Sequence, residues 1–175
     1  MKKYLWTLFA ISLLLGTSCQ EIIDIEKEKE AIKAVIEKET NSHLSRDSDR
    51  HNECFVQDER LIMLGSTDGI FYYYKGWKEI SLAYEGIYAD SPNPITDIYQ
   101  YTNYKIEVNK GSAWAVYDEI AHDAEGEFLV NNKSARILEK VDGEWKIIYM
   151  SFIEIPSDED EEVDVDIEDE EEDNE

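Results

Sequence analysis

The 175-residue sequence has few of the residues that cross-link a fold, bind a metal or contact nucleic acid. It contains two cysteines and three histidines, and the histidines, His43, His51 and His122, are too widely spaced to indicate a metal site. Lysine and arginine number 17 against 41 aspartates and glutamates. Phosphate binding requires clustered basic residues, so nucleic acid is excluded as a partner. A glycine-rich phosphate loop, a serine elbow and paired catalytic carboxylates are also missing, and we expect no cofactor.

The longest apolar run lies at the start of the chain. Lys2 and Lys3 precede the run 4–15, and small residues lead from it to Cys19. A run of about a dozen apolar residues is typical of a secretory signal and too short for a membrane-spanning helix. The segment resembles a bacterial lipoprotein signal, in which the cysteine becomes the lipid-modified N-terminus. An ordinary signal peptide is the alternative, because Gly16 stands where a leucine is usual.

This resemblance implies a position in the cell. Residues 1–18 would be removed, Cys19 would carry the lipid, and residues 19–23 would be a short tether. We therefore expect a protein anchored in a bacterial cell envelope, on the periplasmic face or at the surface of the outer membrane. With Cys19 acylated, Cys54 has no partner for an internal disulfide, so the fold must depend on its core.

The charge is concentrated at the other end of the chain. Fourteen of the residues 158–175 are acidic and none is basic, against a net charge of −24 for the whole chain. A block of like charge cannot bury enough apolar surface to fold, so we expect residues 157–175 to be a disordered tail. It has no glycine for a calcium-binding loop of the EF-hand type. Residues 24–156 then form one domain.

Hydrophobic periodicity divides this domain into helices followed by strands. Ile32, Val35 and Ile36 share one face of a predicted helix over 26–45. A second short helix is predicted over 47–55 with Ser45 as its cap, then a strand over 60–64, a loop over 65–69 and a third helix over 77–88. From residue 95 the period changes to two, and further strands are predicted at 104–108, 112–121, 128–141 and 144–155. This order predicts an α+β fold with three helices packed on one face of a curved antiparallel sheet.

The order of elements resembles the nuclear transport factor 2-like superfamily, which includes SnoaL-like cyclases and ketosteroid isomerases. Three segments carry the resemblance: 45–59, 74–80 and 135–147. It implies a cone-shaped, cystatin-like α+β roll whose sheet wraps around a pocket roofed by the first and third helices. The positions used by the isomerases fall on Glu39, Met63 and Ile137. Neither Met63 nor Ile137 can transfer a proton, so isomerase chemistry is not expected.

The first helix carries two candidate site residues. Glu39 and His43 lie one turn apart within the apolar stripe, at helical angles close to that of Ile32. A buried acid and imidazole need partners and could satisfy each other, leaving one imidazole nitrogen to act as a base. The alternative is that Glu39 reaches solvent and His43 is structural.

The second strand of the meander carries the other candidates. Alternation places Trp114 and Asp118 on one face and Tyr117 and Glu119 on the other. We expect the face with Trp114 and Asp118 to point inward, where Arg136 of the next strand would pair with Asp118. That pair could be structural or could bind a substrate. Trp114, Tyr117 and Arg136 are predicted to line the pocket.

Three functions fit these residues. The first is a lipid-anchored protein that binds a small molecule in the pocket. The second is a SnoaL-like enzyme that uses Glu39, His43 and Asp118 as acid–base groups. The third is an assembly module that forms a homodimer through its sheet, since alternating tyrosines often pack in such interfaces. We favour the first, with an unidentified ligand and no metal.

Overall fold

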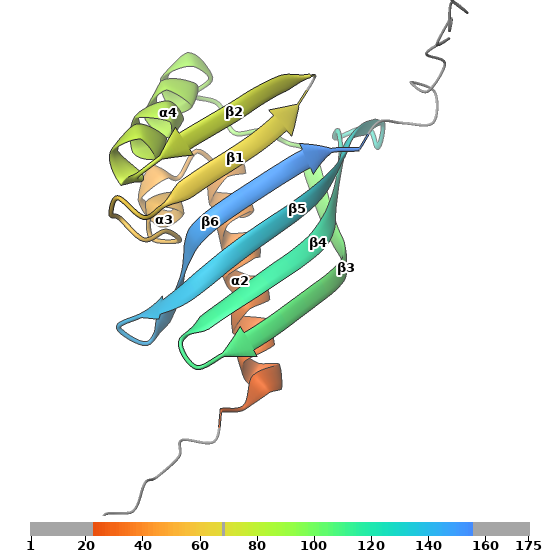
Figure 1. The fold of residues 1–175 in the computed structure, drawn as a ribbon. Coiled ribbons are helices and arrows are strands. Elements are labelled where there is room, and N and C mark those ends of the chain that lie inside the picture. The colour runs from red at the N-terminus through yellow and green to blue at the C-terminus, as the bar shows by residue number, and fades with distance from the viewer. Residues whose placement is uncertain (1–22, 68, 156–175) are drawn as a thin grey trace, which may run out of the picture.

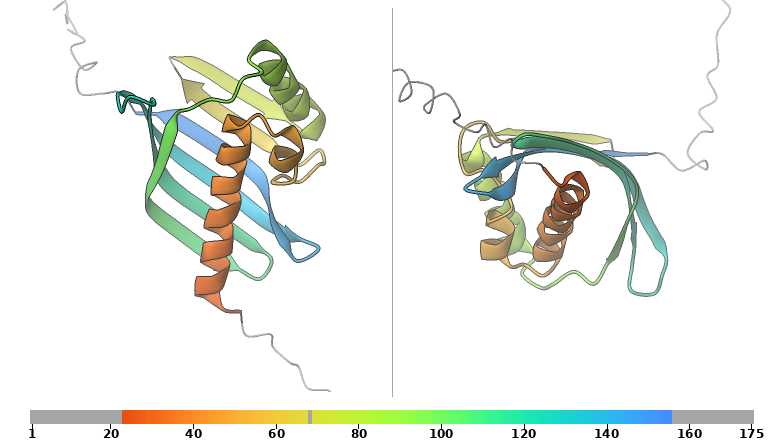
Figure 2. Two further views of the ribbon diagram at one scale, coloured as in Figure 1. Left: turned by 180° about the vertical axis from the view of Figure 1, so that it is seen from behind. Right: turned by 90° about the horizontal axis from the view of Figure 1, so that it is seen from below.

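A six-stranded sheet curves around one long helix in the computed structural model, which describes residues 23–67 and 69–155 (Figures 1 and 2). The sheet order is β2-β1-β6-β5-β4-β3. Neighbouring strands are antiparallel except β1 and β6, which are parallel. The α+β fold with a curved sheet is thereby confirmed. The leader, Cys19 and the acidic tail lie outside the described residues.

Helix α2 (Ile25–Leu44) lies inside the curl of the sheet, as the view from below shows (Figure 2). It begins at Asp24, whose side chain accepts a hydrogen bond from the backbone N–H of Lys27 at 3.1 Å. Ile32 and Ile36 of its apolar stripe are fully buried. None of the helices within residues 23–155 combines the length and apolar character needed to cross a membrane.

Helix α3 (Ser48–Asn52) is shorter than predicted, and its cap is Asp47. The Asp47 side chain accepts from the Arg50 N–H, while Ser45 caps the other end of α2. The prediction of Ser45 as the α3 cap is therefore wrong. The chain after α3 is extended: Cys54 and Val56 exchange backbone hydrogen bonds with Ile147, which ends the helix and buries Cys54.

The predicted loop at 65–69 belongs mainly to a hairpin. Strands β1 (Ile62–Thr67) and β2 (Ile70–Lys75) pair antiparallel, with Thr67 opposite Ile70. The predicted strand was too short and the second strand was missed, because the polar tip hid the alternation that continues on both sides. Helix α4 (Trp77–Asp90) follows Gly76 and packs beside β2.

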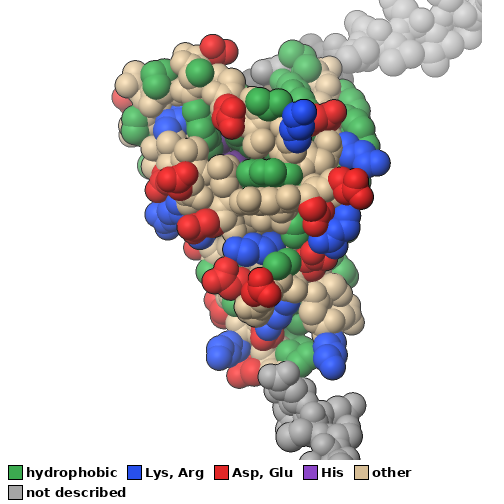
Figure 3. All heavy atoms as spheres, turned by 90° about the vertical axis from the view of Figure 1, so that its left-hand side faces the viewer, with side chains coloured by type: hydrophobic (Ala, Val, Ile, Leu, Met, Phe, Trp, Pro, Cys, Tyr) green, Lys and Arg blue, Asp and Glu red, His purple; other side chains and the backbone are tan. Residues whose placement is uncertain are grey.

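The four strands predicted for the C-terminal half are present and form an antiparallel meander, in which each strand pairs with the next. Its strands are β3 (Ile98–Asn109), β4 (Ser112–His122), β5 (Phe128–Val141) and β6 (Glu144–Glu154). The turn between β5 and β6 places Asp142 and Gly143 at φ 53° and 87°, as a two-residue hairpin requires. Register shifts between β3 and β4 and between β5 and β6 help the sheet to bend. The body tapers toward the start of α2 (Figure 3).

Candidate ligand pocket

A cavity of about 550 Å³ lies between α2, α4 and the inner face of the sheet. It lies toward the wider end of the cone, and charged side chains of both signs are scattered over the face seen in Figure 3. Its wall is mainly apolar and aromatic, formed by Met63, Tyr72, Tyr74, Ala83, Tyr84, Ile87, Tyr99, Met150 and Phe152. The polar part of its wall comes from Glu39, Thr40, His43, Thr67, Glu119, Asn132 and Arg136.

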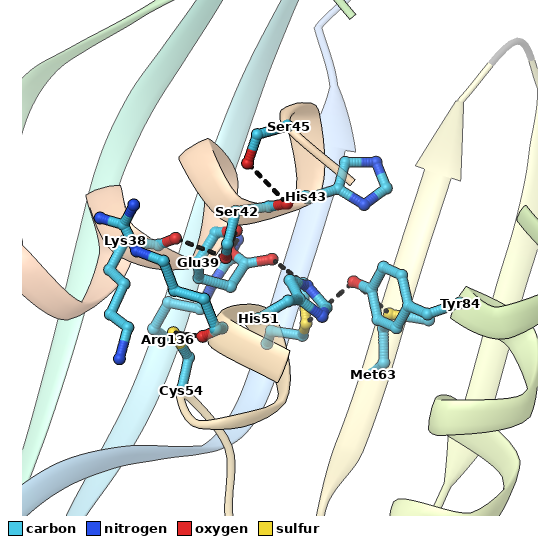
Figure 4. Close-up of polar contacts among 12 residues, drawn as sticks. Lys38, Glu39, Ser42, His43, Ser45, His51, Cys54, Met63, Tyr84 and Arg136 are labelled. Atoms are coloured by element: carbon cyan, nitrogen blue, oxygen red, sulfur yellow. Dashed lines mark hydrogen bonds and ion pairs between the residues drawn. The ribbon is translucent and has the colours of Figure 1, made fainter. Parts of the chain in front are cut away.

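A buried ion pair joins α2 to the sheet at this wall. Arg136 Nη2 donates to Glu39 Oε2 at 3.3 Å, and both side chains are almost completely buried. Arg136 Nη1 donates to the carbonyl oxygens of Ser151 at 3.0 Å and Ala135 at 3.1 Å. Figure 4 shows His51 of α3 pointing toward Glu39, with His51 Nε2 3.4 Å from Glu39 Oε1. Glu39, His51 and Arg136 together thus connect α2, α3 and β5.

The ion pair keeps Glu39 ionised. Burial alone would raise the pKa of its carboxyl, but His51 and the positive charge of Arg136 outweigh burial and lower this pKa to about 2. A carboxylate held in this way is a poor proton donor near neutral pH. We conclude that Glu39 orders the pocket wall and that a role as catalytic acid is not supported by its surroundings.

His43 does not pair with Glu39 as the sequence suggested. Its Nδ1 lies 3.2 Å from the hydroxyl of Tyr88 on α4, and its Nε2 lies 3.5 Å from Arg46 Nη1. Burial lowers the pKa of His43 to about 4 despite the opposing effect of Glu39. The imidazole is therefore neutral at neutral pH and is a hydrogen-bonding part of the cavity wall. The structure also brings His43 and His51 together, with ring centroids 5.8 Å apart.

Asp118 and Trp114 lie on the outer face of the sheet, opposite to the prediction. Asp118 accepts hydrogen bonds from Lys133 and, at 2.6 Å, from Asn103, while Trp114 is 41% exposed. The pairing of Asp118 with Arg136 is consequently wrong. The physical reason is space: β4 presents its small residues Ala113 and Ala115 to the helix-filled concave side, and bulky Trp114 fits the convex side.

Tyr117 and Arg136 do point inward, although only Arg136 reaches the cavity. Tyr117 is fully buried, packs against Tyr104 at a ring-centroid distance of 4.9 Å, and lies beneath the Arg136 guanidinium at 5.7 Å. It supports the pocket from behind. Ile137 faces out and is 44% exposed, whereas Met63 lines the cavity.

Glu119 is the acid that the sequence-based assignment overlooked. It lies one residue from Asp118 on the opposite face of β4, is 8% exposed, and accepts a hydrogen bond from Ser134 Oγ at 3.1 Å. Burial raises the pKa of its carboxyl, against the opposing attraction of Arg136. Asn132 is its register partner on β5 and also lines the cavity. Ala113, Ala115 and Ala121 share this face with Tyr117 and Glu119. These small residues were the sequence signal that could have identified the inner face.

Comparison with known proteins identifies the fold. No family model matches the chain, and no curated protein matches its sequence. A Nostoc punctiforme protein of unknown function with a cystatin-like fold is 16% identical, with a TM-score of 0.61 over 74% of this chain and 92% of that chain. An NTF2-like protein of unknown function from Shewanella oneidensis is 18% identical, with a TM-score of 0.57 over 72% and 98%. An NTF2-like protein from Pseudomonas putida is 12% identical, with a TM-score of 0.61 over 77% and 91%. The chain therefore has the NTF2-like, cystatin-like fold.

Proposed function

We propose that this domain binds a small organic molecule in the cavity inside the curl of its sheet. The observation that carries the proposal is the composition of the cavity wall: aromatic and thioether side chains surround a small polar group formed by Glu119, Asn132 and Arg136. Ligand pockets commonly combine an apolar wall with a few convergent polar groups that orient the ligand. The cavity volume of about 550 Å³ is within the range of such pockets.

Two features make the cavity suitable for a ligand. The Glu39–Arg136 ion pair joins β5 to α2, so this part of the cavity wall is held in place before a ligand binds. On the other side, Tyr72 and Tyr74 of β2 and Ile87 of α4 are partly exposed, which leaves apolar surface in contact with solvent until it is covered. Covering such surface is favourable by about 25 cal/mol per Å².

Acid–base catalysis is the second candidate, with Glu119 in place of Asp118. Its burial and raised pKa are features of catalytic acids and bases, and it shares the cavity with the neutral imidazole of His43. An enzyme would convert a bound molecule, whereas a binding protein would release it unchanged. Incubation of candidate ligands with the protein, followed by mass spectrometry of the small molecules, separates these two functions.

The cellular setting and the assembly are also part of the proposal. We infer from the lipoprotein-type signal that Cys19 is acylated and anchors the domain in a bacterial envelope membrane. One acyl chain binds a membrane only weakly, whereas two or more give lasting attachment. We further infer that the outer face of the sheet forms a homodimer. Trp114, Ile137 and Ile153 are large apolar residues exposed on three neighbouring strands of this face, and exposed apolar patches commonly mark interaction sites. The mass of the native complex tests the dimer.

The binding proposal is tested by filling the cavity. Ala83 of α4 lines the cavity, and Ala89 lies exposed on the same helix away from it. Native mass spectrometry of the purified protein should detect a retained small molecule, or thermal-shift screening should find one that binds. Ala83→Trp should abolish this binding, and Ala89→Trp should leave it intact. Binding that survives Ala83→Trp unchanged would place the ligand elsewhere, and a complete absence of binding would contradict the proposal.

A further inference from the structure

We propose that the ligand of this pocket is an organic ammonium ion that carries a ring or other apolar group. This inference rests on the proposed binding function and names the chemical class of the ligand. It follows from the distribution of charge and hydrogen-bonding groups along the inner wall, where Glu119 and Asn132 lie side by side facing the cavity.

The buried charges of the wall do not balance. Glu39, Glu119 and Arg136 all line the cavity, and each is more than nine-tenths buried. Arg136 is committed to Glu39 at 3.3 Å and to the carbonyl oxygens of Ser151 and Ala135. The hydrogen bond that Glu119 accepts comes from the neutral hydroxyl of Ser134. One carboxyl group on the wall therefore faces the cavity without a cation bound directly to it among the described residues.

Asn132 provides an independent sign that a hydrogen-bond donor is missing. It is 7% exposed, and its Oδ1 has no hydrogen-bond partner within the described part of the chain. Asn132 faces Glu119 across the β4–β5 pair, and directly opposed residues of two strands have Cβ atoms about 5 Å apart. A ligand N–H group between Glu119 and Asn132 would supply the missing donor to both.

The aromatic wall suits a cation as well. Tyr72, Tyr74, Tyr99 and Phe152 line the same cavity, and the negative face of an aromatic ring attracts an ammonium ion. His43, the imidazole in the wall, is neutral at neutral pH because burial lowers its pKa to about 4, so it does not repel a cation there.

An anionic ligand fits less well. The Nε of Arg136 is a buried donor without a hydrogen-bond partner among the described residues, and it could meet an acceptor. The positive charge of that guanidinium is already neutralised by Glu39, however, and an anion beside it would lie in the same cavity as Glu119. Two negative charges within the same partly buried cavity repel each other. The charge balance thus favours an ammonium ion over a carboxylate.

The inference can be tested with three probes of similar size, namely benzylamine, benzyl alcohol and benzoate. Binding to the purified full-length protein at neutral pH is measured by isothermal titration calorimetry. The charged amine should bind about tenfold more tightly than the alcohol, since hydrogen bonds to charged groups are stronger than neutral ones. Benzoate should bind weakest, because its negative charge would lie in the same cavity as the Glu119 carboxyl. Glu119→Gln should remove this preference, with the amine losing about tenfold in affinity and the alcohol changing little.

Asp118→Asn is the matched control, because it removes the same charge from the adjacent residue on the outer face of β4. It should leave all three affinities unchanged. If the alcohol or benzoate binds as tightly as the amine, or if Glu119→Gln and Asp118→Asn behave alike, the ammonium inference is wrong while the pocket remains a binding site. If the Glu119→Gln protein does not fold, the order of the three probes on the unaltered protein decides. If no probe binds in a way that Ala83→Trp abolishes and native mass spectrometry finds no ligand, the proposed function itself fails.

Discussion

Replacing Arg136 with alanine should destabilise the fold strongly. The substitution removes the positive charge that lies 3.3 Å from Glu39 and also the hydrogen bonds to the carbonyl oxygens of Ser151 and Ala135. Glu39 would remain almost fully buried with His51 as its neighbour. Breaking a buried ion pair by deleting one partner costs about 3–5 kcal/mol, because the remaining charge is left without compensation.

The Glu39 carboxyl provides a second route to this magnitude. Its pKa falls from 4.5 to about 2 in the folded protein, which corresponds to about 3 kcal/mol at 1.36 kcal/mol for each factor of ten in the acid constant. A lowered folded-state pKa contributes stability that is present above pH 4.5 and is lost as the pH falls toward 2. Without Arg136 the desolvated carboxyl takes up a proton more easily. The difference in stability between the two proteins should therefore be largest near neutral pH and should narrow as the solution is acidified.

Urea denaturation followed by tryptophan fluorescence measures this difference, since Trp145 is buried in the core. Lys133→Ala is the control: it removes a cation from the half-exposed pair with Asp118 on the outer face and should cost at most about 1 kcal/mol. The double variant Glu39→Gln with Arg136→Met should recover a large part of the loss, because no charge is then left unpaired. A loss below 1 kcal/mol for Arg136→Ala, or simple additivity in the double variant, would refute the reasoning.

Three further outcomes are expected elsewhere in the chain. Cys19→Ala should leave the protein unprocessed or release it into the soluble fraction, and a processed mutant that stays in the membrane would contradict lipid anchoring. Removal of residues 157–175 should leave the thermal midpoint nearly unchanged, because the sequence predicts a disordered tail, and a decrease of several degrees would contradict that prediction. Burial raises the pKa of the Cys54 thiol to about 12, so this thiol should react with a disulfide reagent at pH 8 only after denaturation; rapid reaction in the folded protein would show that Cys54 is accessible.

The fold could be predicted from the sequence because its signals are local. Ile32 and Ile36 carry the period of a helix, Gly76 precedes an amphipathic run, and Asp142–Gly143 marks a hairpin between two alternating segments. Each of these features depends on residues a few positions apart, and each is present in the structure. The β1–β2 hairpin was missed because its alternation is interrupted by the small and polar residues of the tip at 65–69.

The partner of Glu39 could not be predicted in the same way. The helical stripe put Glu39 on the apolar face of the helix but left open whether its carboxyl is buried or reaches solvent. The structure buries it, and the nearest candidate partner along the helix was His43. The observed partner, Arg136, is 97 residues away along the chain. It meets Glu39 because the sheet curls around α2 and brings the inner face of β5 against the helix (Figure 2). Pairing across such a distance follows from the curvature of the whole sheet, which no local pattern in the sequence specifies.

The orientation of β4 shows how one physical consideration could have decided between two equal patterns. Both faces of the strand offer an aromatic residue and an acid: Trp114 with Asp118, and Tyr117 with Glu119. Hydrophobicity alone therefore does not distinguish them. The concave face of a sheet that encloses a helix has less room per residue than the convex face, so it favours small side chains, and Ala113 and Ala115 accompany Tyr117 and Glu119. Side-chain volume, taken together with the predicted curvature, identifies Glu119 as the acid of the pocket and leaves Asp118 to the outer surface.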